Sequence, residues 1–135
     1  TANSRTFWRE VRDVRPFAGR DDLAFVWRLS LPPAEGAKVA LSILETLKGE
    51  VIYDWGGGQV WLGLQAVTNA GAEVVRSVVA GVGGHATLIR ASQDIRGEVP
   101  VFQPLSAAEG LIAEKIKEGF DPEGVLNPGR MYPGV

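Results

Sequence analysis

The sequence predicts a single α+β domain in which helices cover one face of an antiparallel sheet. Three observations favour this class. The 135 residues are 45% hydrophobic and 22% charged, which is typical of one globular domain. Apolar residues recur at a spacing of two in short runs and at helical spacing in others. Proline or glycine stands at the end of most of these runs and marks where each element stops.

The first element is a helix over residues 4–13, with Ser4 as its N-cap and Pro16 and Gly19 ending it. This region is rich in arginine. The arginines are Arg5, Arg9, Arg12, Arg15 and Arg20. They form either a solvated face with local ion pairs or a set that meets an anion or another protein surface.

A strand is predicted over residues 23–31, because its residues alternate between an apolar and a mixed face. The apolar face holds Leu23, Phe25, Trp27, Leu29 and Leu31. A helix follows, which ends at Gly49. Its apolar stripe consists of Ala37, Ala40, Leu41, Leu44 and Leu47.

Residues 51–55 and 60–64 read as two strands of a hairpin that turns at residues 56–58, which are all glycine. Thr68 or Asn69 then caps a second helix, which residues 83–84 end. Its stripe consists of Val74, Val75, Val78, Val79 and Val82. Residues 86–91 form the fourth strand.

The resulting order of strand, helix, strand, strand, helix, strand is the ferredoxin-like βαββαβ arrangement, with both helices on one face of the sheet. The other face must be exposed to solvent or contact another protein surface. The chain has four tryptophans, which indicate a neighbouring domain on that face.

The C-terminal part adds a polar connection, a helix and a tail. We expect residues 93–104 to be mobile. Ser106 and Glu109 form a capping box for a third helix, which Gly119 ends. The stripe of this helix is Ala108, Ile112 and Ile116. The tail over residues 120–135 combines glycine and proline with apolar side chains, so we expect it to be ordered against a surface.

Composition excludes several kinds of chemistry. The chain has no cysteine, one histidine and a net charge of −2. Disulfides and cysteine nucleophiles are therefore impossible within it, binding to nucleic acid is disfavoured, and no metal site is predicted. The glycines at 56–58 and at 81, 83 and 84 follow a strand or a helix without the phosphate-loop pattern. His85 is either a structural residue or a polar group facing a cofactor or ligand. In a regular strand, His85 and Arg90 would lie on opposite faces of the sheet.

The tail carries the most specific motif. Residues 120–133 read F-D-P-E-G-V-L-N-P-G-R-M-Y-P, which resembles the closing phrase of FAD-linked oxidases of the vanillyl-alcohol oxidase type. Within that family the chain resembles the FAD-binding subunits of glycolate oxidases. Supporting phrases are F-W-R-E-V-R-D at 7–13, W-R-L-S-L-P at 27–32, D-W-G-G at 54–57 and G-G-H-A-T-L at 83–88.

The resemblance implies that residues 1–135 are the cap domain of a longer flavoprotein whose N-terminal FAD-binding domain is absent from this chain. A start at Thr1 fits that expectation. The implied activity is FAD-dependent oxidation of a 2-hydroxy acid such as glycolate, and the isolated fragment is expected to be inactive. The implied partners are that FAD domain, a related flavoprotein subunit and an iron–sulfur subunit. The implied location is the cytoplasm, at the periphery of the inner membrane through partner subunits.

The family pattern assigns cofactor contacts to Asn127, Pro128, Gly129 and Arg130, or else only docking of the cap onto its partner domain. Trp8, Arg12 and His85 are candidates for substrate or interface contacts, and no catalytic residue is assigned. The chain departs from the family pattern at two points. It has no H-x-H motif, and Val11, not arginine, stands three residues after Trp8. A related partner subunit would then oxidise the hydroxy acid. A non-catalytic assembly domain and a stand-alone ligand-binding domain are the alternatives.

Overall fold

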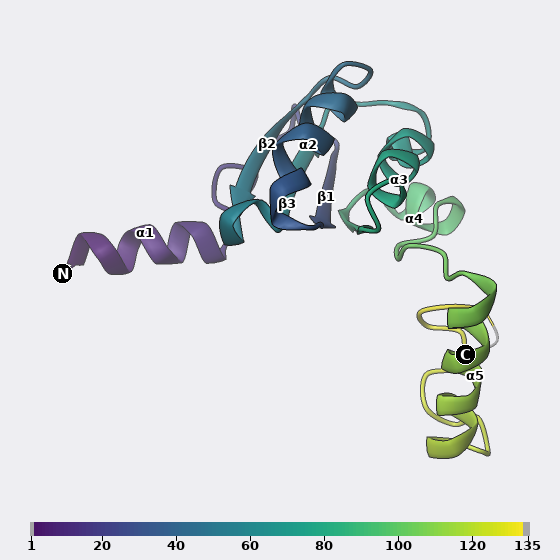
Figure 1. Cartoon of the computed structure of the whole chain (residues 1–135). Coiled ribbons are helices and arrows are strands. Elements are labelled where there is room, and N and C mark those ends of the chain that lie inside the picture. The colour runs from purple at the N-terminus through teal and green to yellow at the C-terminus, as the bar shows by residue number, and fades with distance from the viewer. Residues whose placement is uncertain (1, 134–135) are drawn as a thin grey trace.

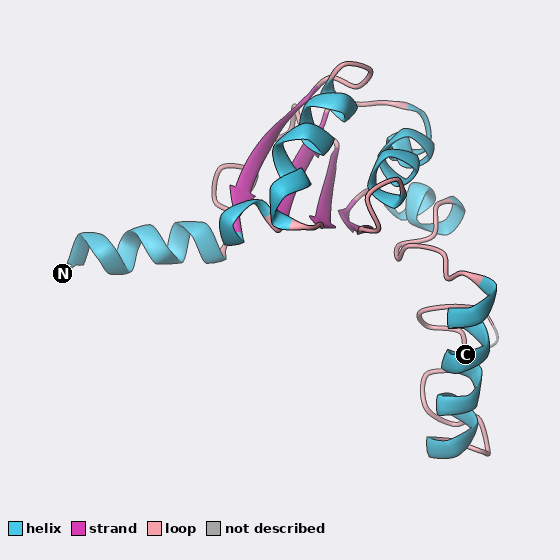
Figure 2. Ribbon diagram, in the orientation of Figure 1, coloured by secondary structure: helices cyan, strands magenta, loops and turns pink. Residues whose placement is uncertain are grey.

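The computed structural model describes residues 2–133. The elements are α1 Ala2–Arg12, β1 Phe25–Ser30, η1 Pro33–Glu35, α2 Gly36–Leu44, β2 Gly49–Asp54, η2 Trp55–Gly57, β3 Gln59–Leu64, η3 Thr68–Gly71, α3 Ala72–Ala80, β4 His85–Arg90, α4 Gln93–Glu98 and α5 Ala107–Phe120. The four strands form an antiparallel sheet of order β2-β3-β1-β4 (Figures 1 and 2). The predicted ferredoxin-like α+β fold is therefore confirmed.

The main core lies between one face of the sheet and the two helices α2 and α3. The alternate residues of β3 all point into it, as the spacing of two predicts, and Val60, Leu62 and Leu64 are fully buried. Ile43 of α2 and Val75 of α3 belong to the same buried cluster. Full burial of an aliphatic side chain of this size stabilises a fold by about 1.5–3 kcal/mol. The two helices thus cover the same face, which we call the inner face.

The stripe predicted for α2 is wrong by part of a turn. Leu41 is 63% exposed, whereas Val39, Ala40 and Ile43 are buried. Contact with the hairpin turn explains this rotation, because a Cβ atom at Gly36 would overlap the carbonyl of Gly57. The helix also ends at Leu44, well before Gly49, which begins β2.

Two further local predictions are corrected. Thr68 and Asn69 do not cap α3, because both lie in η3 and Gly71, at a φ of 65°, is the N-cap. The connection after β4 is not without structure. Its residues 93–98 form α4, and the Ser92 side chain accepts a hydrogen bond from the N–H of Ile95.

The face of the sheet away from the core, here the outer face, is covered only in part. Residues 13–24 return over it after α1, which projects from the sheet (Figure 1). Phe17, Leu23 and Val26 form a small second core there. Leu23 thus joins the outer face, not the inner face, because the regular strand begins at Phe25. Ser4 lies inside α1, so it is not the N-cap.

A β-bulge changes the face on which Arg90 lies. Val26 pairs with Arg90 while Trp27 pairs with Leu88, so β4 has one extra residue at this point. Paired residues share a face. Arg90 is therefore on the outer face, the face of His85, and not opposite to it as regular alternation predicts. Its guanidinium donates to the carbonyls of Phe17 (2.8 Å) and Leu23 (2.6 Å).

The last helix, α5, stands away from the sheet (Figure 1). The predicted capping box is present: Ser106 Oγ accepts from the Glu109 N–H, and Glu109 Oε2 accepts from the Ser106 N–H. Gly119 lies within the helix, and Asp121 is the C-cap. The apolar stripe of α5 has no buried member. Among residues 2–133, no helix has the length and apolar character needed to cross a membrane.

Candidate functional site

The tail folds back onto α5, and Asp121 holds it there. The Asp121 carboxylate accepts from the N–H groups of Val125 (2.9 Å) and Leu126 (2.8 Å). It also pairs with Lys117 Nζ at 2.7 Å, and Lys117 donates to the Leu126 carbonyl as well. The hydrogen bond from Lys117 and then that from Leu126 lower the pKa of Asp121 to about 2. The predicted ordering of the tail is thus present over residues 120–133, but the supporting surface is the chain's own helix; residues 134–135 lie outside the described residues.

The cofactor-binding candidates lie together on an exposed turn of this tail. Asn127 and Gly129 both adopt left-handed backbone conformations, with φ of 47° and 68°. The Arg130 N–H donates to the Asn127 carbonyl at 3.1 Å and closes the turn around Pro128. Glycine removes the side-chain penalty at one of these positions. The turn therefore presents Asn127, Pro128, Gly129 and Arg130 to solvent as one unit.

A groove between α5 and the tail lies beside this turn. Its lining includes Ile116, Phe120, Leu126, Asn127, Arg130 and Met131. Phe120 is 85% exposed, and within residues 2–133 Arg130 forms no ion pair. Exposed apolar surface next to a free cation suits a planar aromatic group with a polar, anionic edge. The residues present therefore fit a flavin at this turn.

His85 takes part in a second hollow, which reaches the tail through Tyr132. The hollow is also lined by Thr87, Phe102 and Gln103. The Phe102 and Tyr132 rings lie 6.1 Å apart, and Gln103 Oε1 accepts from the Ala86 N–H. Phe102 and Gln103 lie in the connection after β4. No local sequence motif marks either residue as part of a site. His85 and the tail are thus brought to one side of the sheet.

Trp8 and Arg12 lie elsewhere, on α1. Trp8 is 63% exposed, and Arg12 donates to Asp13 at 2.7 Å. The hydrogen bond from Arg12 lowers the pKa of Asp13. Trp8 contributes to two hollows. One is a basic groove lined by Ser4, Arg5, Trp8, Arg9 and Arg12. Neither residue lines a hollow with His85 or with the tail.

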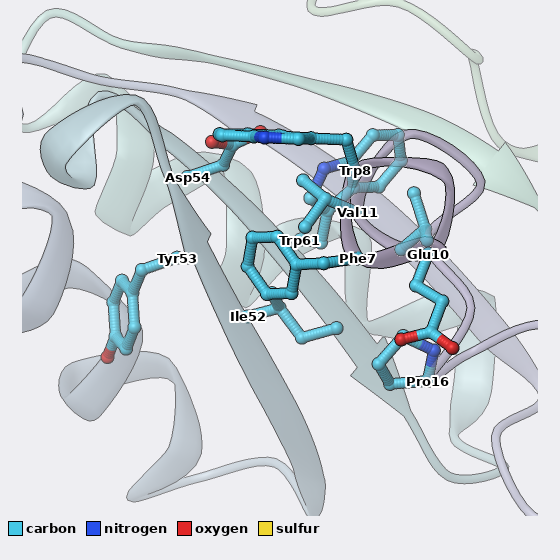
Figure 3. A pocket seen from close by; sticks show the side chains of 10 residues that line it. Phe7, Trp8, Glu10, Val11, Pro16, Ile52, Tyr53, Asp54 and Trp61 are labelled. Atoms are coloured by element: carbon cyan, nitrogen blue, oxygen red, sulfur yellow. The ribbon is translucent and has the colours of Figure 1, made fainter. Parts of the chain in front are cut away.

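The other hollow at Trp8 is an apolar cavity of about 400 Å³ between α1 and the outer face of the sheet. Figure 3 shows Phe7, Trp8 and Val11 of α1 facing Ile52 and Trp61 of the sheet. Glu10 and Asp54 add carboxylates to its lining. This cavity is therefore an apolar and partly open surface on the outer face.

Sequence reasoning also missed Arg76, which ties α3 to the connection after β4. Its guanidinium donates to the carbonyls of Pro100 and Phe102. Burial lowers the pKa of Arg76. The available signal was the single basic residue inside a valine-rich helix. Residues 2–133 contain no group of three His, Asp or Glu side chains that could hold a metal ion.

Comparison with known proteins finds similarity to a subunit of a bacterial oxidase. The chain is 35% identical over 127 residues to glycolate oxidase subunit GlcE of Escherichia coli (strain K12). The alignment covers 93% of this chain but only 31% of that protein, so the chain spans about a third of its relative's length. No family model and no solved structure matches the chain. The resemblance to subunits of glycolate oxidases that the motifs indicate is confirmed by this similarity.

Proposed function

We propose that the chain is the C-terminal cap domain of an FAD-dependent glycolate (2-hydroxy-acid) oxidase or dehydrogenase subunit. The observation that carries the proposal is the 35% identity to a glycolate oxidase subunit over nearly the whole chain. The exposed turn over residues 127–130 supports it, because that turn has the chemistry suited to a flavin edge. The isolated chain is expected to be colourless and inactive, since under this proposal most contacts to FAD would come from an N-terminal domain outside residues 1–135.

Each residue of the turn has a distinct part in this proposal. FAD, when bound, supplies the two-electron acceptor for oxidation of the hydroxy acid. The Asn127 amide offers donors and an acceptor to a polar ring edge. Gly129 leaves the backbone open to close approach, and Pro128 restricts its direction. Arg130 provides a fixed positive charge for the flavin or for a substrate carboxylate.

Contacts outside the turn keep it in place. Asp121 bonds the N–H groups of residues 125 and 126, directly before the turn, and Lys117 bonds the carbonyl of Leu126. The turn is therefore held by α5 and not by the sheet. This arrangement lets the tail present its polar atoms to another domain while the helix supplies the support.

Replacement of Arg130 in the full-length subunit tests the proposal. Arg130→Ala should reduce the ratio of flavin to protein or the rate of glycolate oxidation by about tenfold or more. Arg96→Ala is the matched control, because Arg96 is an exposed arginine whose side chain has no partner among residues 2–133. If both variants had the flavin content and activity of the wild type, the proposed role of the turn at the flavin would be wrong.

A second candidate function is a non-catalytic assembly domain, which the exposed face of α1 favours. Trp8 is exposed there beside Arg5 and Arg9, which form no ion pair within residues 2–133. Aromatic residues and arginines are enriched at the centres of protein interfaces. The partners would be a related flavoprotein subunit and an iron–sulfur subunit. Loss of the complex in a Trp8→Ala, Arg9→Ala variant that retains its flavin would favour this function.

A further inference from the structure

The pairing register places a set of polar residues in the middle of the outer face of the sheet. Arg28 lies on β1, which has a neighbouring strand on each side. It pairs with Trp61 of β3 on one side and with Thr87 of β4 on the other. Ser30 follows two positions later on the same face and pairs with His85. Phrases from separate parts of the sequence, residues 27–32 and 83–88, therefore meet on one surface.

Arg28 differs from the other arginines near this face because its charge has no partner. Arg20 pairs with Asp22 at 2.6 Å and with Glu50 at 2.8 Å. Arg90 donates to main-chain carbonyls. Within residues 2–133, the Arg28 guanidinium forms no hydrogen bond and no ion pair. A cation at the centre of a four-stranded sheet, with no compensating carboxylate, points to an anion from outside this chain.

The hydroxyl groups next to Arg28 are also without partners. Thr87 is 8% exposed, and Ser30 lies diagonally from it across the strand pair. Neither hydroxyl forms a hydrogen bond within the described part of the chain. Thr87 Oγ1 is not among the buried side-chain atoms that lack a partner, so this hydroxyl can still be reached from outside the chain. The indole of Trp61, half-buried, forms an apolar border on the other side of Arg28.

We propose that Arg28, together with the hydroxyls of Ser30 and Thr87, binds the carboxylate of the 2-hydroxy acid. This inference rests on the proposed function. A guanidinium binds a carboxylate through two parallel hydrogen bonds, and a hydroxyl donates to either oxygen. His85 pairs with Ser30 and therefore lies one pair further along the same face than Thr87. A short hydroxy acid held in this way directs its hydroxyl carbon along the face toward His85.

The test is steady-state kinetics of the complete complex that contains the full-length subunit, with glycolate as substrate. Arg28→Met should raise the KM for glycolate by about 10- to 100-fold, as expected for loss of hydrogen bonds to a charged group. Arg28→Lys keeps the charge but loses the paired geometry, so its KM should lie between those of Arg28→Met and wild type. Arg96→Met is the matched control and should leave KM unchanged.

Flavin content and thermal stability are measured on the same variants, so that a folding defect is recognised separately. A lower flavin content or a dissociated complex with unchanged KM would mean that Arg28 meets the flavin domain or a protein carboxylate, and would overturn the inference. If Arg28→Met had the same KM for glycolate as Arg96→Met, the inference about Arg28 would also be overturned, while the proposed function would stand. A wild-type complex that binds no flavin and oxidises no glycolate would overturn both.

Discussion

The guanidinium of Arg76 lies over the indole ring of Trp27, with 5.3 Å between Cζ and the ring centroid. Trp27 is fully buried, and its Nε1–H donates to the Ala70 carbonyl at 2.9 Å. Arg76 in turn donates to Pro100 and Phe102. One stacked pair thus connects the central strand, α3 and the chain segment that leads to α5. The position of the candidate site relative to the sheet depends on this connection.

Replacement of Arg76 should therefore weaken the fold more than its partial exposure implies. Arg76→Met keeps most of the packing but removes the contact with the indole face and both hydrogen bonds. We expect a loss of about 1–3 kcal/mol in the free energy of unfolding, measured by urea denaturation. Arg96→Met, at an exposed position without side-chain partners, should change it by less than about 0.5 kcal/mol. Equal values for the two variants would contradict the role of Arg76.

A side chain at Gly63 should disturb the small second core on the outer face. Gly63 pairs with Val26 on the outer face, and a Cβ atom there would lie 2.8 Å from Leu23 Cδ1 and 3.3 Å from Phe17 Cζ. Gly63→Val should displace the segment over residues 13–24 and cost about 1–3 kcal/mol, measured by urea denaturation. Increased proteolysis of that segment provides a second readout.

Gly97 is the control for this prediction, because a Cβ atom there has no neighbour within 4 Å. Gly97 lies within α4, so Gly97→Ala should be neutral or raise stability by up to about 1 kcal/mol. A Gly63→Val variant as stable as Gly97→Ala would show that the outer cluster does not pack as described.

The tail should loosen in acid. The pKa of Asp121 is about 2 in the folded tail, below its usual value of 3.8. A carboxylate with a lowered pKa stabilises the folded form at pH values above 3.8, and this contribution is lost as the pH falls toward 2. Amide proton resonances of Val125 and Leu126 should therefore shift in this pH window.

Asp121→Asn separates this effect from general acid unfolding. The variant keeps one acceptor oxygen but loses the charge that Lys117 contacts. Its Val125 and Leu126 amides should exchange with solvent faster than those of wild type at pH 7, and their exchange protection should no longer respond to pH between 4 and 2. Wild-type amides that show no transition in this window would refute the role of the Asp121 carboxylate in holding the tail.

Much of the fold could be predicted from local pattern. The alternation in β3 and the valine stripe of α3 each identify a buried face without help from the rest of the chain. The capping box at Ser106 is equally local, because its hydrogen bonds join residues three positions apart. The tail motif is a continuous phrase, so its turn and its likeness to glycolate oxidase subunits could also be recognised in the sequence.

The candidate site was only partly predictable. The residues of the tail turn are adjacent in sequence, whereas the Arg28 cluster joins side chains from different strands whose register no local pattern specifies. His85 was recognised as a candidate, but its association with Phe102 and Tyr132 depends on the path of the connection after β4. That path is held by Arg76, a residue that no motif marked, and by the Leu88 N–H, which donates to the Val101 carbonyl.

The sequence by itself determined the order and type of the strands and of the main helices, because hydrophobic spacing and chain-breaking residues act over a few positions. Tertiary structure decided the rest. Contact between Gly36 and Gly57 sets the rotation of α2, and the bulge opposite Val26 places Arg90 on the outer face. These outcomes depend on steric fit and pairing between distant segments, and such long-range terms override local periodicity when the two conflict.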